Sequence, residues 1–318
     1  MGRKANHHIV PQYYLRQFAQ GVKRNARVVA FDVETGHSFP TSVRNVGAKR
    51  DFNRVEIEGV EPNAVEDALG ELEADFNGAL KSIVADRRFS SDEDFNLLLN
   101  LIALLSVRNE RTRQEFQRFT SETLRLTMQV SLQSEGGWSG MTEKARDAGY
   151  DLSDVSYQDI KEVLDPEKYD IGFEQTYFVT KELEAIDVVL PYLARRNWTL
   201  LEPTASNSFV TCDHPVILSW EDGANQGRFR PPGHGLIGTA VFFPLAPSLA
   251  IYGTFERMTP EFLKVSDGTV AQLNSEIIIN ANRHVFGRDT LWKFWTPNGY
   301  PEASDLSKGL RFLRGEQS

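Results

Sequence analysis

Two adjacent histidines near the start of the chain are the residues best suited to chemistry. His7 and His8 lie in residues 6–16 (NHHIVPQYYLR), directly before a short aromatic-rich stretch. Imidazole acts as an acid, a base or a metal ligand near neutral pH. Neighbouring side chains point to opposite faces of a strand, and on a helix they lie about 100° apart, so at most one ring faces inward unless the backbone bends. The pair is either a catalytic or metal site, or one ring hydrogen-bonded in the core beside one in water.

Two arginines form a second candidate group. We expect one long helix over about residues 92–132, which is apolar on nearly all sides up to Val107 and turns polar at Arg108. Arg108 and Arg111 are three residues apart and would share one face of that helix. If this face is buried, both guanidiniums need carboxylate, phosphate or carbonyl partners. Otherwise they belong to a solvated network of Arg and Glu.

A third group lies within residues 209–216 (FVTCDHPV), where a run of β-forming residues ends in Asp-His-Pro. Asp213 and His214 then stand at the end of a strand, where functional sites often gather. The alternative is a turn in which Asp213 accepts backbone N–H groups. Cys212 is possible as a nucleophile, but a lone cysteine in such a run is more often a small buried apolar residue.

Composition limits the class of protein. Of 318 residues, 41% are hydrophobic and 25% charged, as in ordinary soluble globular proteins. The net charge of −9 argues against a general electrostatic grip on nucleic acid. The single cysteine rules out an internal disulfide and fits a reducing compartment. With no apolar stretch behind the first residues and no run of 18 apolar residues, we expect a cytoplasmic protein without membrane contact.

The elements that must position these groups are predicted from periodicity and turn residues. The N-terminal part predicts a helix from about Pro11 to Phe18, a hairpin of residues 27–33 and 37–43, and a possible strand at 54–57. A helix over 62–86 carries acidic residues on the face opposite its apolar stripe, and we interpret that face as solvated.

The second half turns from helices to strands. We expect a break at Gly136 to Gly140, helices at 142–148, 157–164, 173–195 and 267–284, strands at 198–202, 208–212, 216–220, 240–244 and 249–254, and a glycine-rich loop at 221–238. The predicted fold is α+β, a central helical bundle with a β-sheet built from the N-terminal hairpin and the C-terminal strands. We expect a single compact domain over 1–318, with a His-His helix and hairpin region (1–58), a helical region (59–196) and a β-rich region (197–318).

Four stretches together resemble one bacterial family, that of domain of unknown function 4238. They are NHHIVPQYYLRQF at the start, LLSVRNERTR at the end of the long apolar segment, FVTCDHPV, and FFPLAP at 242–247. The resemblance covers nearly the whole chain, and the first motif is the most specific. The third motif of the family looks like Ser-Asp-Asn-Pro, so Cys212 and His214 are departures from it. The resemblance implies no settled activity.

A local similarity suggests a reaction. The stretch HHIVP looks like the first motif of HNH and related ββα-metal nucleases, in which a metal ion stabilises charge on the phosphodiester and a histidine activates water. Their further ligands come from a following helix, and the nearest candidates here are His37, Asn45 and Asn53.

Ligands from distant parts of the chain are the alternative, and they lead to the main functional hypothesis. We hypothesise a metal-assisted phosphodiesterase or nuclease-like hydrolase that acts on nucleic acid or a phosphorylated small molecule. His7, His8 and Asp213 would bind a divalent metal (Mg, Mn or Zn), one histidine would serve as base, and Arg108 and Arg111 would hold phosphate.

Two other functions stay open. The same His, Arg and Asp residues can form a structural polar network in a non-catalytic binding or interaction module. Alternatively, Arg108 and Arg111 bind a small molecule or nucleotide, with the 221–238 loop as a lid.

Overall fold

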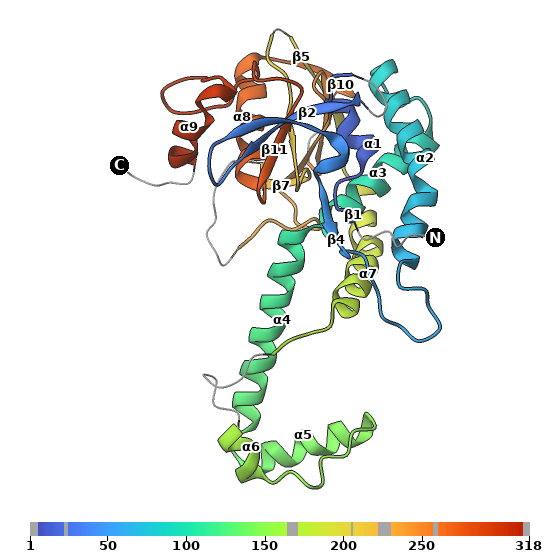
Figure 1. The fold of residues 1–318 in the computed structure, drawn as a ribbon, viewed down its shortest axis with the longest axis vertical. Coiled ribbons are helices and arrows are strands. Elements are labelled where there is room, and N and C mark those ends of the chain that lie inside the picture. The colour runs from blue at the N-terminus through green and yellow to red at the C-terminus, as the bar shows by residue number, and fades with distance from the viewer. Residues whose placement is uncertain are drawn as a thin grey trace. The chain divides into compact units, whose positions relative to one another are not determined.

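The computed structural model describes residues 6–21, 25–163, 171–204, 206–221, 230–256 and 260–313. The chain divides into two compact units, one of Met1–Arg111 with Val179–Ser318 and one of Thr112–Phe178, and each is described by itself. Figure 1 labels the elements along the chain. Part of the predicted 221–238 loop, residues 222–229, lies outside the described residues.

The larger unit contains the predicted sheet of N-terminal hairpin and C-terminal strands. Its order is β3-β2-β11-β6, with bounds β2 Arg27–Asp32, β3 Ser38–Ser42, β6 Thr211–Cys212 and β11 His284–Gly287. The hairpin turn forms because Asp32 accepts the backbone N–H groups of Glu34 and Thr35, while Gly36 takes a φ of 71°. The α+β prediction is therefore confirmed.

A second, five-stranded sheet has the order β10-β5-β9-β8-β7. Its strands are β5 Asn197–Pro203, β7 Ile217–Trp220, β8 Thr239–Ala246, β9 Leu249–Thr254 and β10 Phe262–Val265. Every residue of β8 is buried, so both faces of the sheet are covered. Successive side chains separate into two cores: Phe243 packs with the helices, whereas Phe242 packs with residues of β2, β11 and α8.

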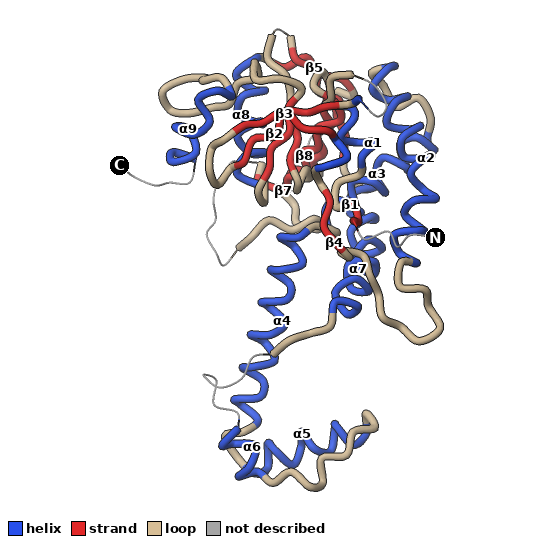
Figure 2. The backbone as a smooth tube through the Cα atoms, viewed as in Figure 1, coloured by secondary structure: helices blue, strands red, loops and turns tan. Residues whose placement is uncertain are grey.

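Helices α2 (Ala64–Asp86) and α3 (Asp92–Val107) pack against each other and belong to the first of these cores. Figure 2 shows the helices beside the strands of this unit. The helix α3 starts at Ser91, whose hydroxyl accepts the N–H of Asp94, and most of its second half is buried, as its lack of a polar face predicts.

The predicted single helix over 92–132 is wrong. The structure has α3 and then a separate α4 (Glu110–Ser131), because Arg108 takes φ −95° and ψ 72° and leaves the helical path. Asn109 stabilises this break with its side-chain amide, which donates to the carbonyls of Leu105 and Ser106. Arg108 and Arg111 therefore do not share one face of a continuous helix.

The first residues form a small layer of their own. Strand β1 (Asn6–His8) pairs antiparallel with β4 (Ala48–Arg50), and α1 (Gln12–Leu15) continues into the 3-10 turn η1 (Arg16–Phe18). The predicted helix over 11–18 is confirmed, with Pro11 before its first turn and Phe18 buried. The possible strand at 54–57 is wrong, since the pairing strand lies earlier, at β4.

The C-terminal helix ends earlier than predicted. The helix α8 runs over Asp267–Asn280, and the strand β11 (His284–Gly287) begins at the residue where the predicted helix ended. These residues are β-branched or aromatic at Val285 and Phe286, and they pair with both β2 and β6. Two short elements follow, η4 (Ala303–Asp305) and α9 (Leu306–Leu313).

The smaller unit is helical. It holds most of α4, then α5 (Glu135–Asp147) and α6 (Tyr157–Val163), and α7 (Gln175–Ala194) begins in it. The predicted break at Gly136 to Gly140 is wrong, because Ser134 caps α5 by accepting the N–H of Gly137 and the glycines lie inside the helix. None of the helices in the described ranges is long and apolar enough to cross a membrane.

Candidate functional site

The two histidines of β1 point to opposite sides, as strand geometry predicts. His7 is fully buried, whereas His8 is partly exposed. The turn before β4 helps to hold the segment that follows them. Gly47, at φ 66°, directs its carbonyl to the N–H groups of both Ile9 and Val10.

Asn53 is the hub of a buried hydrogen-bond network around His7. Its backbone N–H donates to Nδ1 of His7 at 2.8 Å, its side-chain Nδ2 donates to Glu66 at 2.6 Å, and its Oδ1 accepts from Arg108 at 3.1 Å. A backbone N–H can only donate, so Nδ1 of His7 carries no proton and its lone pair is directed at Asn53. His7 therefore positions the loop after β4.

Arg108 ties the N-terminal segment to the end of α3. The side chain is 3% exposed, and it donates to the backbone carbonyls of His8 and Ile9 as well as to Oδ1 of Asn53. Carbonyl oxygens are therefore among the partners that this buried guanidinium takes. The break between α3 and α4 places this residue where its side chain reaches β1.

His8 is held as a neutral imidazole. Arg16 donates to Oε1 of Gln12, so the amide nitrogen of Gln12 faces Nε2 of His8 at 3.0 Å, and that ring nitrogen must accept. Burial lowers the pKa of His8, the charges of Arg108 and Arg16 lower it further, and Glu66 opposes them. At pH 7 the ring is therefore an uncharged hydrogen-bonding group.

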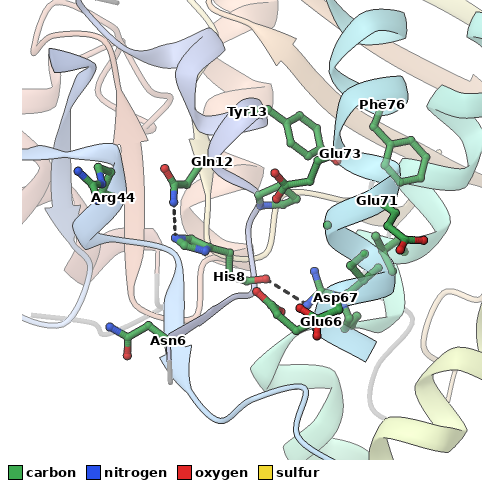
Figure 3. Close-up of a pocket in the computed structure, with 15 residues that line it drawn as sticks. Asn6, His8, Gln12, Tyr13, Arg44, Glu66, Asp67, Glu71, Glu73 and Phe76 are labelled. Atoms are coloured by element: carbon green, nitrogen blue, oxygen red, sulfur yellow. Dashed lines mark hydrogen bonds between the residues drawn. The ribbon is translucent and has the colours of Figure 1, made fainter. Parts of the chain in front are cut away.

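His8 lines a cavity of about 800 Å³ between the N-terminal segment and α2. Figure 3 shows His8 and Gln12 on one side of it and carboxylates from α2 on the other. The charged residues that line it are Glu66, Asp67, Glu71 and Glu73 on α2, together with Arg44 and Arg108. Arg108 is directed at backbone carbonyls, and the four carboxylates outnumber Arg44. The cavity is therefore acidic.

Tyr13 and Phe76 add aromatic walls to this cavity. Burial, and then the carboxylate of Glu73, raise the pKa of Tyr13 well above its ordinary value. The phenol consequently stays protonated and can donate a hydrogen bond at any physiological pH.

Asp213 and Arg111 belong to a different part of the larger unit. Asp213 accepts the backbone N–H groups of Asn282, Arg283 and His284, which lead into β11. Arg111 is close enough to His214 to lower its pKa. Of the five residues proposed from the sequence, the structure thus brings His7, His8 and Arg108 together, whereas Asp213 binds the chain that leads into β11 and Arg111 lies near His214.

The predicted metal-ligand set is not assembled. Within the described ranges, no three His, Cys, Asp or Glu side chains are grouped so that they could hold a metal ion. Glu66, Glu71 and Glu73 were not singled out as site residues, because the acidic face of their helix looks solvated in sequence. A usable signal was the spacing of Glu66, Gly70 and Glu73, which places them on one face of the helix.

Buried His214 predicts a pH-dependent stability. Burial, and then the charge of Arg111, lower its pKa to about 4. In the unfolded chain the pKa of this histidine is near 6.5, so between pH 6.5 and pH 4 the unfolded state binds more protons than the folded state. Stability is therefore lost as the pH falls from about 6.5 toward 4. Between pH 7 and pH 5 the free energy of unfolding, measured in urea, should fall by about 2 kcal/mol less for His214→Gln than for the wild type. Equal losses in the two proteins would contradict the prediction.

Comparison with known proteins gives a family. The match to the family described as "Protein of unknown function (DUF4238)" covers residues 6–290. The chain belongs to this family. The matched span contains the cavity residues, the His7 network and Asp213, so both polar groups lie within the family domain. No curated protein and no solved structure matches the chain.

Proposed function

We propose that this protein binds a small organic cation, such as a primary amine, in the cavity beside His8. The observation that carries the proposal is the four carboxylates of α2 facing a neutral imidazole across about 800 Å³. Carboxylates attract a cation, and an uncharged ring does not repel it. This is the binding-module alternative raised by the sequence, with the ligand's charge now specified.

The aromatic walls favour an organic cation over a hydrated metal ion. Tyr13 and Phe76 line the same cavity as the carboxylates, and ring faces attract ammonium groups. His7 and Arg108 support the site from behind, since their hydrogen bonds hold β1 and the His8 carbonyl in place. In this proposal they are positioning residues.

Calorimetric titration with n-butylamine at pH 7 tests the proposal. We expect saturable binding that weakens as salt is added, since salt screens charges near the surface. Glu73→Gln should reduce the affinity about fivefold, the effect of one carboxylate at a distance of about 4 Å in high dielectric. Asp75→Asn is the matched control, because Asp75 is exposed on the same helix and does not line the cavity. Absence of binding, or equal effects of the two variants, would overturn the proposal.

The second candidate is the metal-assisted phosphodiesterase predicted from the sequence. One observation favours it: His8 is unprotonated, and it can act as a general base once the Gln12 amide that donates to its Nε2 moves away. Magnesium sites often use only one or two protein carboxylates and complete the shell with water and phosphate. Glu66 and Asp67 could supply these, whereas the other carboxylates of the cavity would repel the phosphodiester.

Amine binding, Mn²⁺ binding and diester hydrolysis together separate the two candidates. A phosphodiesterase should bind Mn²⁺ and, with Mn²⁺ present, hydrolyse bis(p-nitrophenyl) phosphate in a reaction that His8→Ala abolishes. A cation-binding protein should bind n-butylamine and leave the diester intact. Turnover of the diester without amine binding would favour the enzyme.

A further inference from the structure

A second cavity adjoins the acidic one. It measures about 390 Å³ and lies between α2, α3 and the part of α7 that belongs to the larger unit. Its lining is almost entirely apolar, namely Ala64, Val65, Ala68, Leu69, Leu72, Phe76, Leu104, Leu183 and Ile186, with Asn100 as the polar exception. Neither the histidines nor the carboxylates of the first cavity contribute to it.

The two cavities share a wall. Leu69, Phe76 and Leu104 line both of them, so the acidic cavity and the apolar cavity are neighbours across the same three side chains. The shared residues come from α2 and α3, whose mutual packing fixes their positions. A ligand with its charged group near Glu73 would therefore have an apolar surface within reach.

The apolar cavity leaves large side chains in contact with water. Leu72 is 44% exposed and Leu183 is 38% exposed. Covering such surface stabilises a complex by about 25 cal/mol for each Å² removed from water. An alkyl chain lying over Leu72 and Leu183 would gain this stabilisation, whereas a compact polar cation would not.

We propose that the ligand is an amphipathic cation, an ammonium group carrying an alkyl chain. The ammonium binds among the carboxylates of α2, and the chain passes the shared wall and occupies the apolar cavity. This inference rests on the proposed function, because it assigns the ligand class of that same site. Charge complementarity selects the head group, and the continuity of the two linings selects the tail.

A chain-length series tests the inference. Calorimetry with n-butylamine, n-hexylamine and n-octylamine, each below its aggregation limit, should show the affinity rising about fourfold for each added methylene. The increase should level off once the apolar cavity is filled. Octan-1-ol, which has the tail without the charge, should bind more weakly than n-octylamine.

Two tryptophan variants localise the tail. Ala68→Trp fills the apolar cavity, so the affinity for n-octylamine should fall toward that for n-butylamine. Ala74→Trp is the matched control, because Ala74 is also exposed on α2 but does not line the cavity. Circular dichroism and thermal unfolding should confirm that both variants fold. Equal effects of the two variants would overturn the placement of the tail.

The outcomes distinguish the two proposals. Binding of n-butylamine with no gain from longer chains would overturn the amphipathic ligand and leave the cation site intact. Failure of every amine to bind would overturn both. Equal affinity for octan-1-ol and n-octylamine would overturn the cation site, because the charge would then contribute nothing.

Discussion

Replacing Arg108 by alanine is expected to lower the free energy of unfolding by about 3–5 kcal/mol, the cost of leaving several buried acceptors without a donor. The three acceptors are the carbonyls of His8 and Ile9 and the side-chain oxygen of Asn53. They are buried or partly buried, so water replaces the guanidinium poorly. Equilibrium unfolding in urea, followed by circular dichroism, measures the loss.

Two further variants show whether the effect comes from these hydrogen bonds. Arg108→Lys keeps the charge but cannot reproduce the planar fork, and an intermediate loss is expected. Arg50→Ala removes an arginine from neighbouring β4 whose side chain is 76% exposed, and it should cost less than about 1 kcal/mol. A small loss for Arg108→Ala would show that the clamp on β1 is weak, and it would reopen a role for this residue in binding phosphate.

Asp213→Ala should be the next most destabilising change, by about 2–4 kcal/mol, because three backbone N–H groups lose their acceptor. The carboxylate binds the N–H groups of residues 282–284 at 2.7–2.8 Å, and the N–H of Asp213 itself donates to the carbonyl of His284. These bonds fasten β6 to the start of β11. Thermal and urea unfolding of the variant measure the effect.

The control is a carboxylate that accepts a single bond of the same kind. Asp289, in the loop after β11, accepts the N–H of Leu291 at 2.9 Å, so Asp289→Ala should cost about 1 kcal/mol or less. Amine and Mn²⁺ titrations of Asp213→Ala separate structure from ligation. A structural Asp213 leaves both affinities unchanged in the folded variant, whereas loss of Mn²⁺ binding would support the metal-ligand role predicted from the sequence.

Local patterns in the sequence were sufficient for most elements and for the fold class. The hairpin of β2 and β3 follows from β-forming residues around Gly36, and the burial of α3 follows from a segment without a polar face. The inward and outward orientation of His7 and His8 follows from the two-residue period of a strand. Each of these depends on interactions between residues close in the chain, which is why periodicity detects them.

Tertiary contacts decided where the helices end and which residues form the site. The long apolar helix stops because the Arg108 side chain reaches carbonyls some 100 residues away, and helical periodicity carries no record of such partners. The predicted helix through His284 likewise ends early, since β2 and β6 offer strand partners to β11. The sequence supplied the His pair, Arg108 and Asp213 as polar residues in unusual places. Only the packing of α2 against the N-terminal segment placed Glu66 and Glu73 in one cavity with His8, because an acidic helix face looks the same whether it borders solvent or a cavity.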